Sequence, residues 1–238
     1  MSKGSETVLK GFLFAGMMVI LSCSSLRQSD GHIRHASGLI RENSYTLKAK
    51  TSLYSGYDPL DVDGNTQVLV EIPAGTNEKW EVNKSNGKLE WEFRNDRPRI
   101  VKYLSYPGNY GMIPRTLLPE KSGGDGDPLD VLVLGQAVPR GTLLKVRLIG
   151  MIRMLDGGER DDKMIAVMLD SPFREIRSLK ELDQKFSGIS EILSMWFSNY
   201  KGPGVMQAGG MADADEAGAV LKTAINAYIE QESTINQE

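Results

Sequence analysis

The feature that most constrains the fold is a change of period late in the chain. Between residues 67 and 169, short apolar segments alternate with turns, whereas after Ser171 apolar residues recur with a helical period. Closely spaced short strands are typical of a β-barrel or a β-sandwich. Asn86-Gly87 lies between two of these segments and favours a tight hairpin. We expect strands at residues 67–72, 79–83, 89–93, 100–104, 129–134, 143–154 and 164–169.

The last part of the chain predicts two helices. Apolar residues recur on one helical face over residues 189–200, and again over residues 217–228. Asp213 and Glu216 precede the second run with the spacing of a capping box. Strands that pack against two helices form an α+β domain. We find no internal repeat or proline-rich linker that would divide it.

The charge balance argues against a nucleic-acid-binding protein. The chain carries 28 Lys and Arg residues and 31 Asp and Glu residues, for a net charge of −3, without a block of like charge. Binding to a phosphate backbone depends on many cationic contacts, so we expect no nucleic acid partner. One cysteine cannot form an internal disulfide, and two histidines cannot alone build a histidine-rich zinc site. A bound metal ion would therefore be held by oxygen atoms.

The N-terminus has the pattern of a lipoprotein signal peptide. Lys3 and Lys10 precede an apolar run at residues 11–21, which is shorter than the roughly 20 residues that span a bilayer as a helix. The run ends in the tetrapeptide Ile-Leu-Ser-Cys, which resembles the lipobox of bacterial lipoproteins, with Cys23 as the lipid-bearing residue. The alternative is a buried free cysteine at the end of a core helix, but the polar residues that follow give such a helix nothing to continue.

This pattern divides the chain into three parts. We expect a lipoprotein signal peptide at residues 1–22, a polar tether at residues 23–53 and a folded domain at residues 54–238. The lipid would anchor the protein to a membrane of the bacterial cell envelope, on the periplasmic or the outer face. The alternative location is the cytoplasm.

The most informative stretch is an acidic, glycine-rich loop at residues 123–130. It holds three carboxylates, Asp125, Asp127 and Asp130, ahead of an apolar segment. Carboxylates this close repel one another unless cations or protons lie between them. Because Mg²⁺ prefers oxygen ligands, it would suit such a cluster.

Three other interpretations of this loop compete with a magnesium site. An EF-hand would need an oxygen ligand and a glycine where Leu129 and Asp130 lie, so a calcium sensor is excluded. An aspartate nucleophile of the haloacid dehalogenase type should follow its strand, whereas these acids precede theirs. A solvated acidic turn is the usual meaning of clustered Asp, Gly and Pro. The loop alone leaves the metal site and the turn equally open.

Charged and aromatic residues elsewhere favour a site over a turn. Glu71 lies within an apolar strand, where a carboxylate needs a partner. A second acidic turn precedes Lys163, and a Tyr-Lys pair closes the first predicted helix. Tyr103, Tyr106 and Tyr110 crowd the segment before the acidic loop. Each feature has an ordinary structural explanation, but their combination indicates one polar site.

Taken together, these motifs resemble those of the soluble family I inorganic pyrophosphatases. The similarity runs in order from about residue 67 to residue 201. The matching motifs are the Asp-x-Asp-Pro-apolar-Asp-apolar signature from Asp125, the Tyr-Pro-x-Asn-Tyr-Gly motif from Tyr106, the Asp-x4-Asp-x-Lys spacing from Asp156, the Lys-x-Glu pair of Lys79 and Glu81, and Tyr200-Lys201.

The resemblance implies a fold and a reaction. The fold is α+β, a closed OB-like β-barrel with flanking strands and two main C-terminal helices. The reaction is the hydrolysis of pyrophosphate to two phosphates with Mg²⁺. Asp130 would bridge two metal ions, and Asp127 would be the general base that takes a proton from the attacking water. The implied metal ligands are Glu71, Asp125, Asp130, Asp156 and Asp161.

The resemblance also assigns residues to the substrate. Tyr110 joins Asp127 and Asp130 in the implied catalytic set, and Glu81 supports the site. The implied phosphate-binding residues are Lys79, Arg99, Tyr106, Lys163, Tyr200 and Lys201. Bacterial members of the family are commonly hexamers, so a homo-oligomer is a further expectation.

Two departures from the family pattern matter. Arg94, Arg97 and Arg99 all lie ahead of the tyrosine motif with altered spacing, and we choose Arg99 for the phosphate, with Arg97 as the alternative. After Lys201, residues 204–210 replace the basic, tryptophan-containing run of the best-known bacterial members. This replacement weakens one outer phosphate contact and leaves the implied catalytic set intact.

Two other functions compete with pyrophosphate hydrolysis. A lipid-anchored module that binds divalent cations or phosphate without catalysis predicts damage to the signature acids, and all of them are present. An enzyme for longer polyphosphates or nucleoside triphosphates would keep the metal cluster. We rank it below pyrophosphate hydrolysis because the tyrosines are the only evident aromatic residues for stacking on a base.

Overall fold

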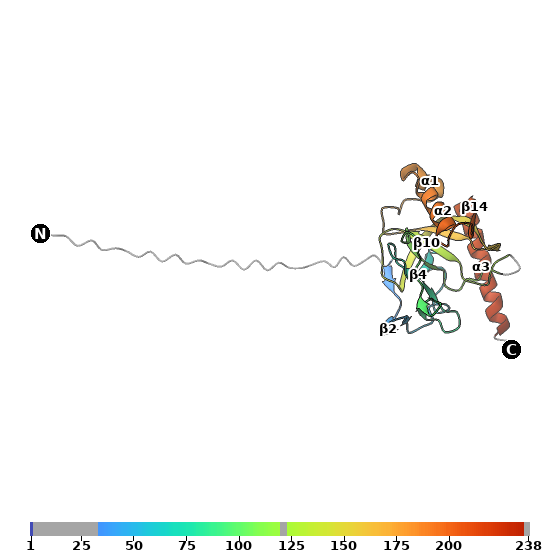
Figure 1. Ribbon diagram of the computed structural model, residues 1–238, viewed down its shortest axis with the longest axis horizontal. Helices are drawn as coiled ribbons and strands as arrows, with labels where there is room; N and C mark the ends of the chain where they lie inside the picture. Colours follow the sequence, from blue (N-terminus) through green and yellow to red (C-terminus); the bar gives the residue numbers. More distant parts are fainter. Residues whose placement is uncertain (2–32, 120–122, 236–238) are drawn as a thin grey trace.

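The computed structural model describes residue 1 and residues 33–119 and 123–235 (Figure 1). Its largest sheet joins eight strands of the described chain and contains one strand far longer than the rest. The eight strands are β1 (Ile33–His35), β4 (Thr66–Ile72), β9 (Asn109–Met112), β10 (Asp130–Leu134), β11 (Thr142–Asp156), β12 (Glu159–Arg160), β13 (Lys163–Met168) and β14 (Met206–Ala212).

Five of these strands form a ring of pairings. The ring runs β4–β9–β10–β13–β11 and returns to β4, and only β10 and β13 are parallel. The α+β class is confirmed by this mixed sheet and the helices around it. The closed OB-like barrel stays a prediction, because the five strands are not spaced evenly around one axis.

Two smaller sheets flank the ring. One has the strand order β2-β3-β6-β5, and the other is the hairpin of β7 and β8. The hairpin predicted around Asn86-Gly87 is confirmed, since β5 and β6 pair antiparallel on either side of it. The bounds are β2 (Ile40–Asn43), β3 (Thr46–Lys48), β5 (Trp80–Val82), β6 (Leu89–Trp91), β7 (Phe93–Arg94) and β8 (Arg97–Pro98).

The strand predicted at residues 100–104 is wrong. Ile100 makes only an isolated bridge to Glu78. The amide of Asn77 then donates to the backbone carbonyls of Val101 and Tyr103, at 3.0 Å each. A side chain thus satisfies backbone groups that a ladder would otherwise use.

Part of the predicted tether is folded. β1 pairs with β11, and β2 and β3 belong to the flanking sheet. Ala36, Leu47 and Leu53 are buried in one core cluster with Trp80 and Leu89. The domain therefore includes residues 33–53, ahead of the expected boundary at residue 54. The predicted signal peptide after residue 1, Cys23 and the start of the tether lie outside the described residues.

Three helices are present among the described residues, namely α1 (Leu179–Lys185), α2 (Ile189–Asn199) and α3 (Ala214–Ile235). The two predicted helices correspond to α2 and α3, whereas α1 was not expected. The capping prediction is confirmed in part, because Asp213 Oδ1 accepts a hydrogen bond of 2.9 Å from the Glu216 amide. No helix in the described ranges is long and apolar enough to cross a membrane.

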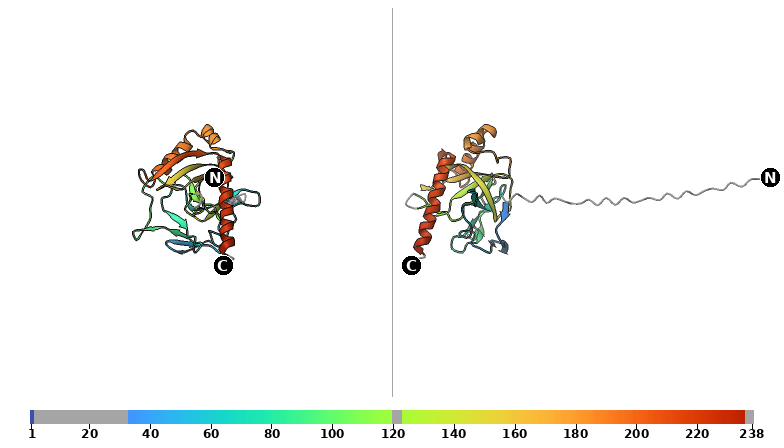
Figure 2. Two further views of the ribbon diagram at one scale, coloured as in Figure 1. Left: turned by 90° about the vertical axis from the view of Figure 1, so that its right-hand side faces the viewer. Right: turned by 180° about the vertical axis from the view of Figure 1, so that it is seen from behind.

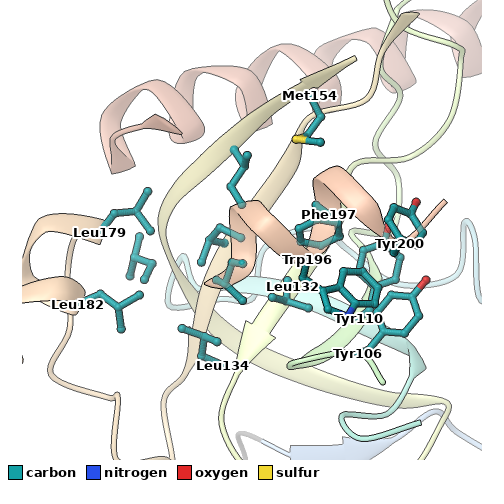
Figure 3. Packing of buried hydrophobic residues seen from close by; sticks show 14 of the residues in the cluster. Tyr106, Tyr110, Leu132, Leu134, Met154, Leu179, Leu182, Trp196, Phe197 and Tyr200 are labelled. Carbon is teal, nitrogen blue, oxygen red and sulfur yellow. The ribbon is translucent and has the colours of Figure 1, made fainter. Parts of the chain in front are cut away.

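Strand alternation separates the two larger of the three core clusters in the described residues. Leu132, Leu134 and Ile165 face α1 and α2, whereas Val131 and Val133 face the side that α3 covers. α3 runs along one side of the body, and α1 and α2 lie at one end (Figures 1 and 2). The aromatic residues of the first cluster gather at the C-terminal end of α2 (Figure 3). Because helices cover both faces of these strands, a polar site can form only at the ends of the strands.

Gly111 should be required for the close approach of β9 and β4. A Cβ at this position would lie 1.9 Å from the Leu69 carbonyl oxygen. We expect Gly111→Ala to lower the free energy of unfolding by about 3 kcal/mol or more. Gly218→Ala on the exposed face of α3 is the matched control, because its Cβ meets open space and should add about 0.5–1 kcal/mol. Urea unfolding measures the free energy of unfolding of both variants. An equal change in the two would contradict the close approach of the strands.

Asp61 should give the fold part of its acid sensitivity. Although burial acts in the opposite direction, hydrogen bonds from Lys145 and Asn65 hold the pKa of the Asp61 carboxyl well below its usual value. Because the folded pKa is the lower one, this carboxylate stabilises the fold above about pH 4, and the contribution is lost as the pH falls. Asp61→Asn should therefore lower the melting temperature at pH 7 and flatten its fall between pH 5 and pH 3. Asp63→Asn, an exposed neighbour, should leave both unchanged.

Candidate active site

The ends of several strands surround one polar cleft of about 700 Å³. β10 and β13 run parallel with Asp130 opposite Lys163, so their first residues meet at the same edge. β11 ends at Asp156, which lines the same cleft, and Tyr200 and Lys201 line it directly after the last residue of α2, Asn199. The cleft thus collects side chains from segments that lie far apart in the sequence.

All but two of the residues implied by the resemblance line this cleft. They are Glu71, Lys79, Glu81, Arg99, Tyr110, Asp125, Asp127, Asp130, Asp156, Asp161, Lys163, Tyr200 and Lys201. Tyr106 does not line it and is 2% exposed, with its ring centroid 4.5 Å from that of Trp196. The hydroxyl oxygens of Tyr106 and Tyr200 lie at the edge of the aromatic cluster (Figure 3). Cys23 is outside the described residues.

A buried lysine holds the two acidic turns together. The Lys163 side chain is 1% exposed, and its Nζ lies 2.6 Å from Asp130 Oδ2 and also contacts Asp161. Although burial acts against it, these two acids raise the pKa of Lys163. At Asp130, burial acts to raise the pKa of the carboxyl group, but the nearby Lys163 and Lys79 ammonium groups lower it below its usual value. At Asp161, burial raises the pKa.

Two further lysines are paired with acids of the cleft. Lys201 contacts Asp156, and Lys84 contacts Asp127 while its Nζ donates to the Gly126 carbonyl at 3.1 Å. Lys84 was not among the predicted site residues. The hairpin turn that carries it was recognised, but the sequence does not show that this turn faces the acidic loop.

Glu71 sits at an irregularity in β4. The register of β4 against β9 shifts between Val70 and Ile72, which makes Glu71 the extra residue of a β-bulge. Its Oε1 accepts a hydrogen bond of 2.7 Å from the Val82 amide, and burial raises the pKa of Glu71 to about 8. Arg140 Nε donates to the Glu71 backbone carbonyl at 2.7 Å. The bulge and these bonds aim a buried carboxylate into the cleft.

The cationic residues on the other wall are also paired. Lys79 Nζ lies 2.6 Å from Glu81, and Arg99 forms a hydrogen bond of 2.6 Å to Glu92. Arg99 lines the cleft and Arg97 does not, which favours Arg99 over the alternative. Tyr110 is buried, and its ring lies under the Lys79 ammonium group at 5.4 Å.

The cleft carries a large excess of negative charge. Its lining holds eleven acidic and five cationic residues. An anionic compound could not bind beside this many carboxylates unless cations neutralised them. The donor set consists of carboxylate oxygens, which a hard divalent cation prefers. The residues therefore fit a metal ion of the Mg²⁺ type.

No preformed metal cluster is present in the described part of the chain. No group of three or more His, Cys, Asp or Glu residues there is arranged to hold a metal ion. Ammonium groups instead lie against the acids: Lys163 on Asp130 and Asp161, Lys201 on Asp156, and Lys84 on Asp127. A cation would replace or displace these contacts.

Comparisons with known proteins connect this cleft to a family. A family model described as inorganic pyrophosphatase matches residues 68–229. The chain is 48% identical over 117 residues to the soluble inorganic pyrophosphatase of Oryza sativa subsp. indica. This match covers 48% of this chain and 50% of that protein. Over 175 residues, it is 35% identical to soluble inorganic pyrophosphatase 2 of Chlamydomonas reinhardtii, which covers 71% of this chain and 84% of that protein.

A solved structure agrees with the sequence comparisons. The crystal structure of an inorganic pyrophosphatase from Neisseria gonorrhoeae is 32% identical with a TM-score of 0.59, and the match covers 72% of this chain and 95% of that one. The chain therefore belongs to the inorganic pyrophosphatase family, as the motifs predicted. It spans about half the length of the rice relative that it matches.

Mg²⁺ should stabilise the fold through the acidic cleft. A ligand present at about 100 times its dissociation constant adds about 2.7 kcal/mol to the free energy of unfolding. We expect Mg²⁺ to raise the melting temperature, and Asp130→Asn to reduce that increase. Asp215→Asn, an exposed acid in the first turn of α3, is the matched control and should keep the full increase. An increase that is the same in all three proteins would place the cation outside the cleft.

Proposed function

We propose that this protein hydrolyses inorganic pyrophosphate to two phosphates. The observation that carries the proposal is one cleft that combines an excess of carboxylates with lysine, arginine and tyrosine side chains. Pyrophosphate is a compact polyanion that repels an attacking hydroxide, so its hydrolysis requires charge neutralisation and an activated water. Family membership supports the same reaction.

Mg²⁺ is the proposed cofactor. When bound, it would neutralise substrate charge and acidify the attacking water. The proposed ligands are Glu71, Asp125, Asp130, Asp156 and Asp161, all of which line the cleft.

The remaining residues bind phosphate and move the proton. Asp127 would accept the proton of the attacking water, with Asp130 and Tyr110 completing the catalytic set. Glu81 would keep Lys79 in place through their ion pair. The proposed phosphate contacts are Lys79, Arg99, Lys163, Tyr200 and Lys201, with Tyr106 supporting them from behind the wall.

The cellular setting is a separate part of the proposal. The lipobox-like sequence supports a lipid on Cys23 and a location in the bacterial cell envelope, with the cytoplasm as the alternative. Assembly as a homo-oligomer rests on the family resemblance alone. Labelling with radioactive palmitate in a bacterial host, with Cys23→Ser as the control, tests the lipid.

Asp127→Asn should remove the proposed base. We expect the variant to fold normally and to lower the rate of phosphate release from pyrophosphate by about 10³-fold, the scale of general base catalysis. Lys84→Met is the matched control, because it breaks the same ion pair and keeps the carboxylate. It should retain most of the activity. Near-normal turnover in Asp127→Asn would exclude this residue as the base.

The metal requirement separates the proposal from its main rival. Phosphate release by the wild-type protein should depend on Mg²⁺, stop with EDTA and be lost in Asp130→Asn. A folded protein that binds Mg²⁺ but releases no phosphate would instead be the non-catalytic binding module.

A further inference from the structure

A groove beside the cleft carries charge of the opposite sign. Its volume is about 1130 Å³, and its lining contains five cationic residues and no acidic residue. Three residues, Arg99, Tyr200 and Lys201, line both the groove and the cleft, so the two share a wall. The cationic residues of the groove are Arg94, Arg97, Arg99, Lys102 and Lys201.

A tight hairpin holds two of these arginines directly opposite each other. Arg94 of β7 pairs with Arg97 of β8 across a two-residue turn. The turn residues Asn95 and Asp96 have φ values of 52° and 58°, which fit the type I′ turn of a short hairpin. Like charges opposite each other on neighbouring strands are destabilising. An anion bound between them would offset that repulsion.

No described side chain forms an ion pair with the outer cations of the groove. Arg94, Arg97 and Lys102 are exposed and form no hydrogen bond or ion pair to any described side chain. Arg99 and Lys201, on the shared wall, each pair with a carboxylate of the cleft. Guanidinium and ammonium groups that are free and gathered in one concave site suit phosphate oxygens.

We propose that the groove binds the phosphate groups of a linear polyphosphate beyond the two that the cleft holds. The inference rests on the proposed function, since it places a pyrophosphate unit in the cleft. A chain of three or more phosphates would pass the wall of Arg99, Tyr200 and Lys201 and meet Arg97 and Lys102. Pyrophosphate itself has no third phosphate to place there. The groove therefore favours longer chains as ligands of the same site.

The test removes two groove charges that do not belong to the cleft. Arg97→Gln/Lys102→Gln changes residues that line the groove alone. The matched control is Lys180→Gln/Lys185→Gln, which removes the same charge from α1, away from both linings. Both pairs are made in Asp127→Asn, in which turnover of the ligand should be about 10³-fold slower. Titration calorimetry at one free Mg²⁺ concentration then compares pyrophosphate, tripolyphosphate and ATP.

The groove variant should bind tripolyphosphate about tenfold more weakly, whereas its affinity for pyrophosphate should change less than about twofold. The control should match the parent for all ligands. If only tripolyphosphate binds more weakly, the ligand of the groove is a free polyphosphate chain. If ATP also binds more weakly, the groove accepts a phosphate chain that ends in a nucleoside. Unchanged binding of tripolyphosphate, or an equal loss for pyrophosphate, would overturn the proposal.

Phosphate release from pyrophosphate by the wild-type protein is measured separately. If it fails while the groove variant still discriminates between chain lengths, then the proposed reaction is wrong and the groove proposal stands as a binding site. If release is normal and discrimination is absent, then only the groove proposal fails.

Discussion

The site depends on one buried ammonium group, that of Lys163. It is the first residue of β13 and lies opposite Asp130, the first residue of the parallel strand β10. Removing a charged group from water is costly unless opposite charges surround it, and Asp130 and Asp161 both contact this one. The pair lies where the two strands begin. It also brings the acidic loop and the second acidic turn to the same edge of the sheet.

This arrangement produces two neighbouring compartments of opposite sign. The cleft has more than twice as many acidic as cationic residues in its lining, whereas the groove lining has cations only. An anion can enter the first compartment only together with metal ions, but it can enter the second directly. The shared residues Arg99, Tyr200 and Lys201 mark the boundary between the two compartments. The two compartments therefore differ in the sign of the charge that their walls present.

The sequence predicted the parts of the fold whose signals are local. The ring strands β4, β10, β11 and β13 and the helices α2 and α3 have clear periodicity. The acidic residues of the motifs line one cleft. The strands β1 to β3 were missed because each has only three or four residues. In addition, β1 and β3 are held by pairing with the distant strands β11 and β6. β14 was missed because its glycine-rich sequence resembles a loop, although it pairs with β11. Lys84 and the burial of Tyr106 depend on which segments meet in space, which no local pattern reports.

The fifteen-residue strand β11 has a consequence for how the protein opens. It pairs with five others, namely β1, β4, β12, β13 and β14, and it contributes side chains to both main core clusters. A segment with this many neighbours is not released by a local fluctuation, because every partner strand would have to separate from it. Its backbone amides should exchange with solvent only when the whole domain unfolds. Motions on the edge hairpin of β7 and β8 can therefore occur without disturbing the strand that the ring is built on.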